Sequence, residues 1–157
     1  NATIRPGQWR TALGVAGRVR DQHFMLQKEV VDRMVASPGS RTYGRLSVML
    51  QSRYRLTKLF DVGAGAFRPA PEVTSSIVRM QPLPVALHPA ADARRFAQLV
   101  SAAFGQRRKT LRNALAELAS IDVIRAAAVD PQARAETLSV DDFARLTAAV
   151  AAAQESD

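Results

Sequence analysis

The sequence contains no cysteine, which excludes disulfide bonds, thiolate metal sites and a cysteine nucleophile. This composition is compatible with a reducing compartment. No run of about 20 apolar residues occurs, so a membrane-spanning helix is not expected. The two histidines, His23 and His88, have no neighbours at metal-ligand spacing, so we expect neither a metal site nor a catalytic histidine.

Arginine is the residue that the sequence has in excess. The net charge is +8, and most of the basic side chains are arginines rather than lysines. Residues 1–80 contain thirteen basic and five acidic side chains, whereas residues 81–157 contain nine of each. Because arginine binds phosphate through two donors and stacks on bases, the first block predicts a surface that faces a polyanion. A genome rich in G and C would also enrich arginine, and composition alone leaves both interpretations open.

The hydrophobic pattern changes at a linker that contains Pro82, Pro84 and Pro89. Before the linker, the pattern predicts strands near 23–27, 56–62 and 73–80 and helices near 28–36 and 43–54. After it, only helical spacing remains, at 91–105, 107–118, 123–129 and 140–152. We therefore predict an α/β fold, with part of an open sheet in residues 1–82 and a small all-helical domain in residues 83–157.

Four ordered segments together resemble one family. They are HFMLQKEV at 23–30, YGRLSV at 43–48, FRPAPEV at 67–73 with Ser75-Ser76 following, and FGQRRKTLRN at 104–113. Their order and spacing are similar to the C-terminal part of the bacterial small-subunit ribosomal RNA adenine dimethyltransferases, over about residues 21–150. Four motifs in order are more specific than any single pattern. Residues 1–20 do not resemble the family and stay unassigned.

The resemblance implies a fold and an activity. The fold would be the C-terminal part of a Rossmann-like methyltransferase sheet, followed by a helical domain that binds ribosomal RNA. The activity would be the transfer of methyl groups from S-adenosylmethionine to N6 of adenines in small-subunit ribosomal RNA. The partner would then be this RNA or the 30S precursor, in the cytoplasm and without a metal or a membrane.

The loop Phe67-Arg68-Pro69-Ala70-Pro71 is the candidate for holding the target adenine. An enzyme that alkylates a base nitrogen must take the base out of its stack. An aromatic side chain on a loop stiffened by prolines can stack on such a base, a contact worth about 1–3 kcal/mol. On its residues alone the motif would more often be a buried phenylalanine before a turn. The resemblance favours Phe67 as the stacking residue, with Pro69 and Pro71 holding the loop.

A cluster of cations is the candidate RNA-binding site in the helical part. Arg107, Arg108, Lys109 and Arg112 occur within six residues, and no acidic residue lies between positions 93 and 116. On a helix over 104–118, Arg108 and Arg112 would share one flank while Arg107 would lie near the apolar face. Charge runs are usually solvated surfaces, but the missing acidic partners favour phosphate binding.

Two further segments have weaker signals. Arg45 begins a predicted helix, and we interpret it as an additional contact to the RNA backbone. The Gln27-Lys28-Glu29 segment ends a predicted strand, which is where open α/β sheets build their sites. A structural role for the Lys28-Glu29 pair is slightly favoured over a functional one.

The parts that would hold the methyl donor are missing from the sequence. The resemblance implies a glycine-rich turn between a strand and a helix, and an Asn-Leu-Pro-Tyr tetrapeptide that orients the adenine. Gly63-Ala64-Gly65 leads into the proline loop instead, and Asn1 is followed by Ala2-Thr3-Ile4. We therefore predict no cofactor-binding and no catalytic residue in this chain, and expect it to be inactive alone. The exposed sheet edge left by the missing half would allow a dimer.

Two other functions compete with the enzymatic one. The chain could be a non-catalytic RNA-binding or ribosome-assembly module that keeps the basic surface. It could instead be a helical DNA-binding domain, which predicts helix-turn-helix spacing within residues 91–129. The second alternative leaves the strands and the proline loop unexplained.

Overall fold

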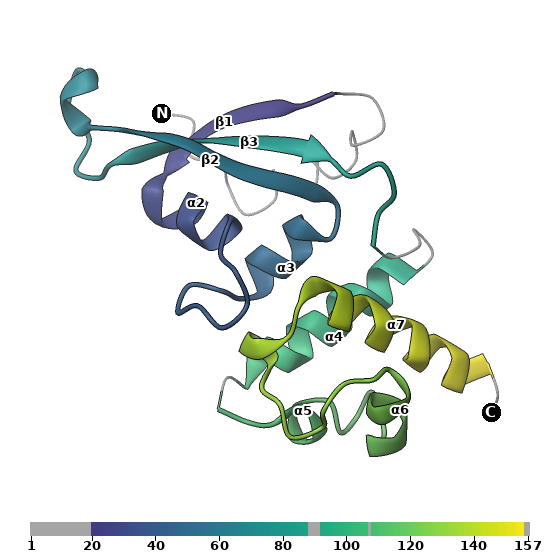
Figure 1. The fold of residues 1–157 in the computed structure, drawn as a ribbon. Helices are drawn as coiled ribbons and strands as arrows, with labels where there is room; N and C mark the ends of the chain where they lie inside the picture. The colour runs from purple at the N-terminus through teal and green to yellow at the C-terminus, as the bar shows by residue number, and fades with distance from the viewer. Residues whose placement is uncertain (1–19, 88–91, 107, 156–157) are drawn as a thin grey trace.

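A three-stranded sheet forms the first part of the chain. The computed structural model describes residues 20–87, 92–106 and 108–155. The strands are β1 (Gln22–Gln27), β2 (Tyr54–Val62) and β3 (Ser75–Pro82). They are arranged in the order β1-β3-β2, with β3 antiparallel to both neighbours. Consequently β1 and β2 run parallel, and their carboxyl ends meet at the same edge of the sheet (Figure 1).

Two short helices cover one face of this sheet. They are α2 (Lys28–Met34) and α3 (Arg45–Gln51), and both lie below the strands in Figure 1. The alternation of burial along β3 places Val78 and Met80 on the covered face, where they pack with Val31, Leu50 and other apolar side chains. This alternation is the two-residue period of a strand that is buried on one side.

The opposite face of the sheet has an apolar stripe. Met25 and Phe60 are both paired with Ile77 in the strand register, so the three side chains share this face. Met25 is 48% exposed and Phe60 is 59% exposed. Within residues 20–87, 92–106 and 108–155, no helix covers this face (Figure 1). Large exposed apolar side chains grouped in this way indicate a surface for another protein element.

Helices form the second part of the chain. They are α4 (Ala93–Gly105), α5 (Leu111–Ala114), α6 (Ile121–Ala126), the 3-10 turn η3 (Ala135–Thr137) and α7 (Val140–Glu155). Their core includes Phe96 and Phe143, both fully buried, and the ring of Phe143 lies 5.7 Å from that of Phe104. Ser139 caps the start of α7, since its Oγ accepts a hydrogen bond from the backbone N–H of Asp142 at 3.1 Å.

The two parts are joined through α3 and the turn before it. Tyr43 and Val48 pack in the core of the helical part, although they precede β2 and β3 in sequence. The buried Tyr43 hydroxyl donates a hydrogen bond to the Leu138 carbonyl oxygen at 2.8 Å. The Gly39 N–H donates to the Glu136 carbonyl oxygen at 2.7 Å. The division into domains at residues 82 and 83 remains a prediction, and these contacts connect its two sides.

Two predicted helices differ from the structure. The helix predicted over 43–54 is limited to Arg45–Gln51, because β2 already begins at Tyr54 and the Arg53 carbonyl oxygen accepts a hydrogen bond from Leu83 N–H. The continuous helix predicted over 107–118 is wrong. Among residues 108–118, only the single turn of α5 is helical.

Candidate nucleic-acid interface

The proline loop lies where an open α/β sheet presents its ligands. Residues 63–74 connect β2 to β3 and extend beyond the carboxyl ends of β1 and β2 (Figure 1). Phe67 and Pro71 are half-buried and Pro69 is exposed. Because Phe67 is only half-buried, part of this residue remains accessible to a ligand. The role of Phe67, Pro69 and Pro71 at the adenine remains a prediction.

The basic cluster has a different geometry from the one predicted. Helix α4 ends at Gly105, and Thr110 has an extended backbone with ψ of 159° before α5 begins at Leu111. The Leu111 N–H donates to the Ala133 carbonyl oxygen at 2.9 Å, and the Arg112 N–H donates to the Pro131 carbonyl oxygen at 3.0 Å. These contacts satisfy backbone donors at the start of α5, which would otherwise have no partner within the helix. Arg108 and Arg112 therefore do not share the flank of one helix.

The cations of this segment remain free to bind a phosphate. Arg108, Lys109 and Arg112 are exposed. In the described part of the chain none of them has a carboxylate partner, and the Arg112 guanidinium only contacts the neighbouring Asn113 side chain at 3.4 Å. Arg107 lies outside the described residues, so its prediction is neither supported nor contradicted.

Arg45 belongs to a second segment near the same side of the molecule. It is the first residue of α3 and is exposed, whereas Tyr43 just before it is buried. Burial, and to a lesser extent the carboxylate of Asp142, raises the pKa of the Tyr43 hydroxyl, so this group stays protonated and keeps donating to Leu138. Tyr43 thereby anchors the turn that presents Arg45.

Arg134 is a basic residue that the sequence analysis missed. It is exposed and directly precedes η3. Before Arg134, the carbonyl oxygens of Pro131 and Ala133 accept hydrogen bonds from the start of α5. After Arg134, the carbonyl oxygen of Glu136 accepts one from the Gly39 N–H. Arg134 thus lies between the segment of Arg112 and the segment of Arg45. An isolated arginine between two alanines has no local sequence signal, because only long-range backbone contacts place it there.

We call Arg45, Arg108, Lys109, Arg112 and Arg134 the basic surface. In Figure 1, the turn before α3, η3 and the segment before α5 all face the left of the view, as does the proline loop. These segments are linked to one another by the backbone hydrogen bonds given above, except for the proline loop. Exposed cations on such a frame can bind the phosphates of a nucleic acid.

A network of charges lies beside the proline loop. Lys28 Nζ donates to Asp32 Oδ2 at 2.6 Å, so Lys28 pairs with Asp32 and not with its neighbour Glu29, which pairs with Arg33. Lys58 Nζ lies 3.0 Å from Asp32 Oδ1 and 2.8 Å from Asp61 Oδ1. The lysine ammonium groups hold the pKa values of Asp32 and Asp61 below their ordinary range, with Ser76 also contributing at Asp61.

These pKa shifts predict that acid weakens the fold. A carboxyl whose folded pKa is lowered stabilises the fold above its unfolded pKa, 3.8 for both groups, and this stability is lost as the pH falls further. We expect the urea midpoint to fall between about pH 5 and about pH 3. The Asp32→Asn variant should be less stable than the parent near pH 6, and the two curves should converge at low pH. If the urea midpoints of the parent and of Asp32→Asn fell in parallel over this pH range, the role of Asp32 in the pH dependence would be contradicted.

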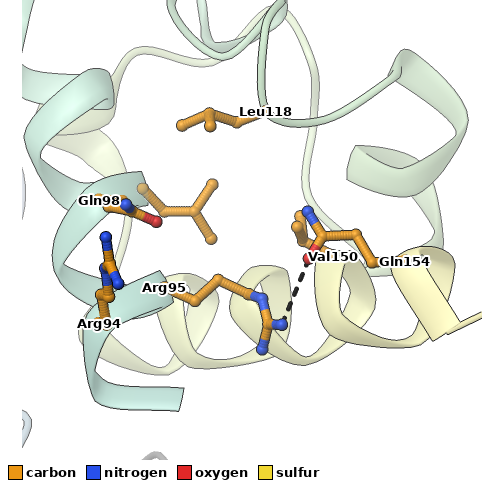
Figure 2. A pocket seen from close by; sticks show the side chains of 7 residues that line it. Arg94, Arg95, Gln98, Leu118, Val150 and Gln154 are labelled. Atoms are coloured by element: carbon orange, nitrogen blue, oxygen red, sulfur yellow. Dashed lines mark hydrogen bonds between the residues drawn. The ribbon is translucent and has the colours of Figure 1, made fainter.

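A cavity of about 240 Å³ lies elsewhere, between α4 and α7 (Figure 2). Leu99, Leu118 and Val150 are its apolar lining, and the polar lining is Arg94, Arg95, Gln98 and Gln154. Arg95 is held by the Asp92 carboxylate and by a 3.3 Å hydrogen bond to Gln154. No predicted site residue that the structure describes lines this cavity.

The described residues offer neither a candidate metal site nor a candidate membrane span. Among the residues that the structure describes, no group of three or more histidine, aspartate or glutamate side chains could hold a metal ion. His23 Nδ1 lies 4.0 Å from the carboxylate oxygen Oδ1 of Asp21, and His88 lies outside the described residues. None of the described helices is both long and apolar enough to span a membrane.

The described residues do not fit S-adenosylmethionine. The one junction in them that leads directly from a strand into a helix is between β1 and α2, and it contains no glycine. The Lys28 N–H at the start of α2 already donates to the Thr74 carbonyl oxygen at 2.9 Å. Gly63 and Gly65 flank a 3-10 turn that leads into the proline loop rather than into a helix. The absence of a donor site from this chain stays a prediction.

The fold places the chain in a structural class. It is similar to a dimethyladenosine transferase from Plasmodium falciparum, with a TM-score of 0.75 and 22% identity over 92% of this chain and 63% of that chain. It is also similar to the 23S rRNA methyltransferase ErmE, with a TM-score of 0.65 and 18% identity over 95% of this chain and 63% of that chain. The predicted fold class, the C-terminal part of a Rossmann-like methyltransferase sheet followed by a helical domain, is thereby confirmed.

Sequence comparison then identifies the family. The family model described as ribosomal RNA adenine dimethylase matches residues 11–152, and the chain belongs to this family. The match begins ten residues earlier than the predicted resemblance, so residues 11–20 are part of it. Ribosomal RNA small subunit methyltransferase A of Aromatoleum aromaticum is 58% identical over 137 residues, or 87% of this chain and 52% of the relative. The protein of the same name from Bordetella petrii is 57% identical over 139 residues, or 88% and 53%. The chain thus spans about half the length of these relatives.

Proposed function

We propose that this chain is the RNA-facing part of an enzyme that dimethylates N6 of adenines in small-subunit ribosomal RNA. S-adenosylmethionine would be the methyl donor, bound by a part of the fold that the described residues do not contain. The chain's own partner would be the ribosomal RNA or the 30S precursor, and its location the bacterial cytoplasm. Its relatives named small subunit methyltransferase A support this assignment.

One observation carries the proposal. The cations of the basic surface are exposed, and the segments that carry them lie toward the left of Figure 1, as the proline loop does. RNA bound along these cations would be fixed by its phosphates, and an unstacked base could then contact Phe67. Methyl transfer requires the acceptor nitrogen and the donor to be held in line, and this chain would supply the acceptor side of that arrangement.

A non-catalytic RNA-binding module remains the second candidate. The observation that favours it is that the described junction leading directly from a strand into a helix, between β1 and α2, contains no glycine. Both candidates predict RNA binding by the basic surface. They differ in whether a complementary donor-binding part restores methyl transfer.

Self-association is proposed for the chain on its own. The free edge of β1 has no strand beside it in the described residues, and the apolar stripe of Met25, Phe60 and Ile77 adjoins it. Unpaired strand edges pair readily with other chains. A dimer through this edge would pair the backbone groups of β1 with those of a second copy.

The role of the proline loop is tested by Phe67→Ala. The chain is titrated with a small-subunit ribosomal RNA hairpin that has 2-aminopurine in place of one loop adenine at a time. We expect the parent to change the fluorescence of one probe position, and the variant to lose that change and bind about 5- to 100-fold more weakly. Phe60→Ala is the matched control, since it removes an exposed phenylalanine from the open face of the sheet. Equal behaviour of the parent and Phe67→Ala would contradict the proposal.

A further inference from the structure

We infer that Lys28, Asp32, Lys58 and Asp61 are positioning residues that hold both ends of the proline loop in place. This inference rests on the proposed function, because it concerns the loop that would hold the target adenine. It assigns a role to a group of side chains that otherwise contacts neither the basic surface nor the cavity between α4 and α7.

The first end of the loop is held through Asp61. This residue is the second-last residue of β2, and its Oδ1 atom accepts hydrogen bonds from Ser76 Oγ at 2.6 Å and from Lys58 Nζ at 2.8 Å. Ser76 is fully buried in β3 and is paired with Asp61 in the strand register. The Asp61 carboxylate therefore joins the strand that enters the loop to the strand that leaves it.

The second end of the loop is held through Lys28. Its backbone N–H donates to the carbonyl oxygen of Thr74, the last loop residue, at 2.9 Å. Its ammonium group binds Asp32 at 2.6 Å, one helical turn further along α2. Asp32 in turn binds Lys58 at 3.0 Å, and Lys58 binds Asp61, so the contacts join the two ends of the loop through helix α2.

The arrangement of charge explains why these contacts act together. Two ammonium groups alternate with two carboxylates, and Lys58 and Asp32 each contact two partners of opposite sign. A single partly exposed ion pair contributes little stability. Here, however, the loss of Lys58 removes the link between Asp32 and Asp61 and leaves α2 attached to only one end of the loop. The effect is therefore expected to be local to residues 63–74 and the start of α2.

Amide hydrogen exchange tests this inference without requiring activity. The reporters are the Ala66, Phe67 and Lys28 amides, which donate to Gly63, Ala64 and Thr74. In the Lys58→Met variant we expect these amides to exchange about fivefold faster than in the parent, while amides within β1 and β3 keep their protection. Lys58→Arg keeps the charge and should restore slow exchange. Glu29→Gln is the matched control, since it removes an ion pair with Arg33 from the same helix outside the network.

RNA binding gives a second readout that general destabilisation would not produce. If the network positions Phe67, the effect of Phe67→Ala on RNA affinity should be several-fold smaller in the Lys58→Met background than in the parent. Unchanged exchange of the three reporters in Lys58→Met, or equally faster exchange throughout the sheet, would overturn the inference. A failure of Phe67→Ala to weaken RNA binding would instead count against the proposed function, and the exchange result would still decide the positioning role.

Discussion

The double variant Arg108→Ala and Arg112→Ala is expected to bind a small-subunit ribosomal RNA hairpin on the order of tenfold more weakly than the parent at about 0.15 M salt. Both side chains are exposed and lack a carboxylate partner in the described residues, so they are available to phosphates. Each phosphate contact releases counterions. The slope of log affinity against log salt should therefore become shallower by about 2.

The control for this variant removes the same charge elsewhere. Arg94 and Arg125 are exposed and lie on α4 and α6, outside the basic surface. Replacing both with Ala should leave the salt slope close to that of the parent, because neither contacts the proposed RNA path. Equal losses in the two double variants would show that only net charge matters. That result would remove the basis for the basic surface.

Phe143→Ala is expected to unfold most of the helical part. Phe143 is fully buried at the start of α7, and its ring packs on Phe104, which in turn contacts the ring of Tyr43 at 6.1 Å. Truncating a buried phenylalanine costs about 3–5 kcal/mol, a large share of the stability of a domain of this size. Urea unfolding followed by circular dichroism measures this cost.

The consequence of Phe143→Ala should extend to RNA binding. Loss of this core would release the turn that is anchored by Tyr43, and with it the placement of Arg45 relative to Arg134. Phe60→Ala provides the comparison, because it truncates a phenylalanine that is 59% exposed and should change the stability by less than about 1 kcal/mol. Similar midpoints for Phe143→Ala and the parent would contradict the described core.

Several elements were predictable because their signals are local. Strand β1 and the start of α7 lie within one residue of their predicted positions. An apolar run specifies the strand, and a serine cap specifies the start of the helix. The loop predicted from its prolines is also present, between β2 and β3. The family resemblance, resting on four ordered motifs, is confirmed by a match over residues 11–152.

Other features depend on contacts between distant residues. Leu111, Leu115 and Leu118 have the spacing of one continuous helix. The carbonyl oxygens of Pro131 and Ala133 bind the start of α5 instead, and the helix is limited to Leu111–Ala114. Lys58 lies 26 residues from its partner Asp32, so no local pattern reveals the pair. Arg134 joins the basic surface for the same reason. Periodicity cannot predict such placements, because it describes only neighbours along the chain.

The most direct test of the account is a calorimetric comparison of two ligands on this chain. We expect saturable binding of a small-subunit ribosomal RNA hairpin that weakens with salt, and no saturable heat with S-adenosylmethionine. The described residues supply a basic surface for the first ligand and no glycine turn from a strand into a helix for the second. A saturable micromolar site for S-adenosylmethionine, or RNA binding that does not respond to salt, would contradict the division of roles proposed for this chain.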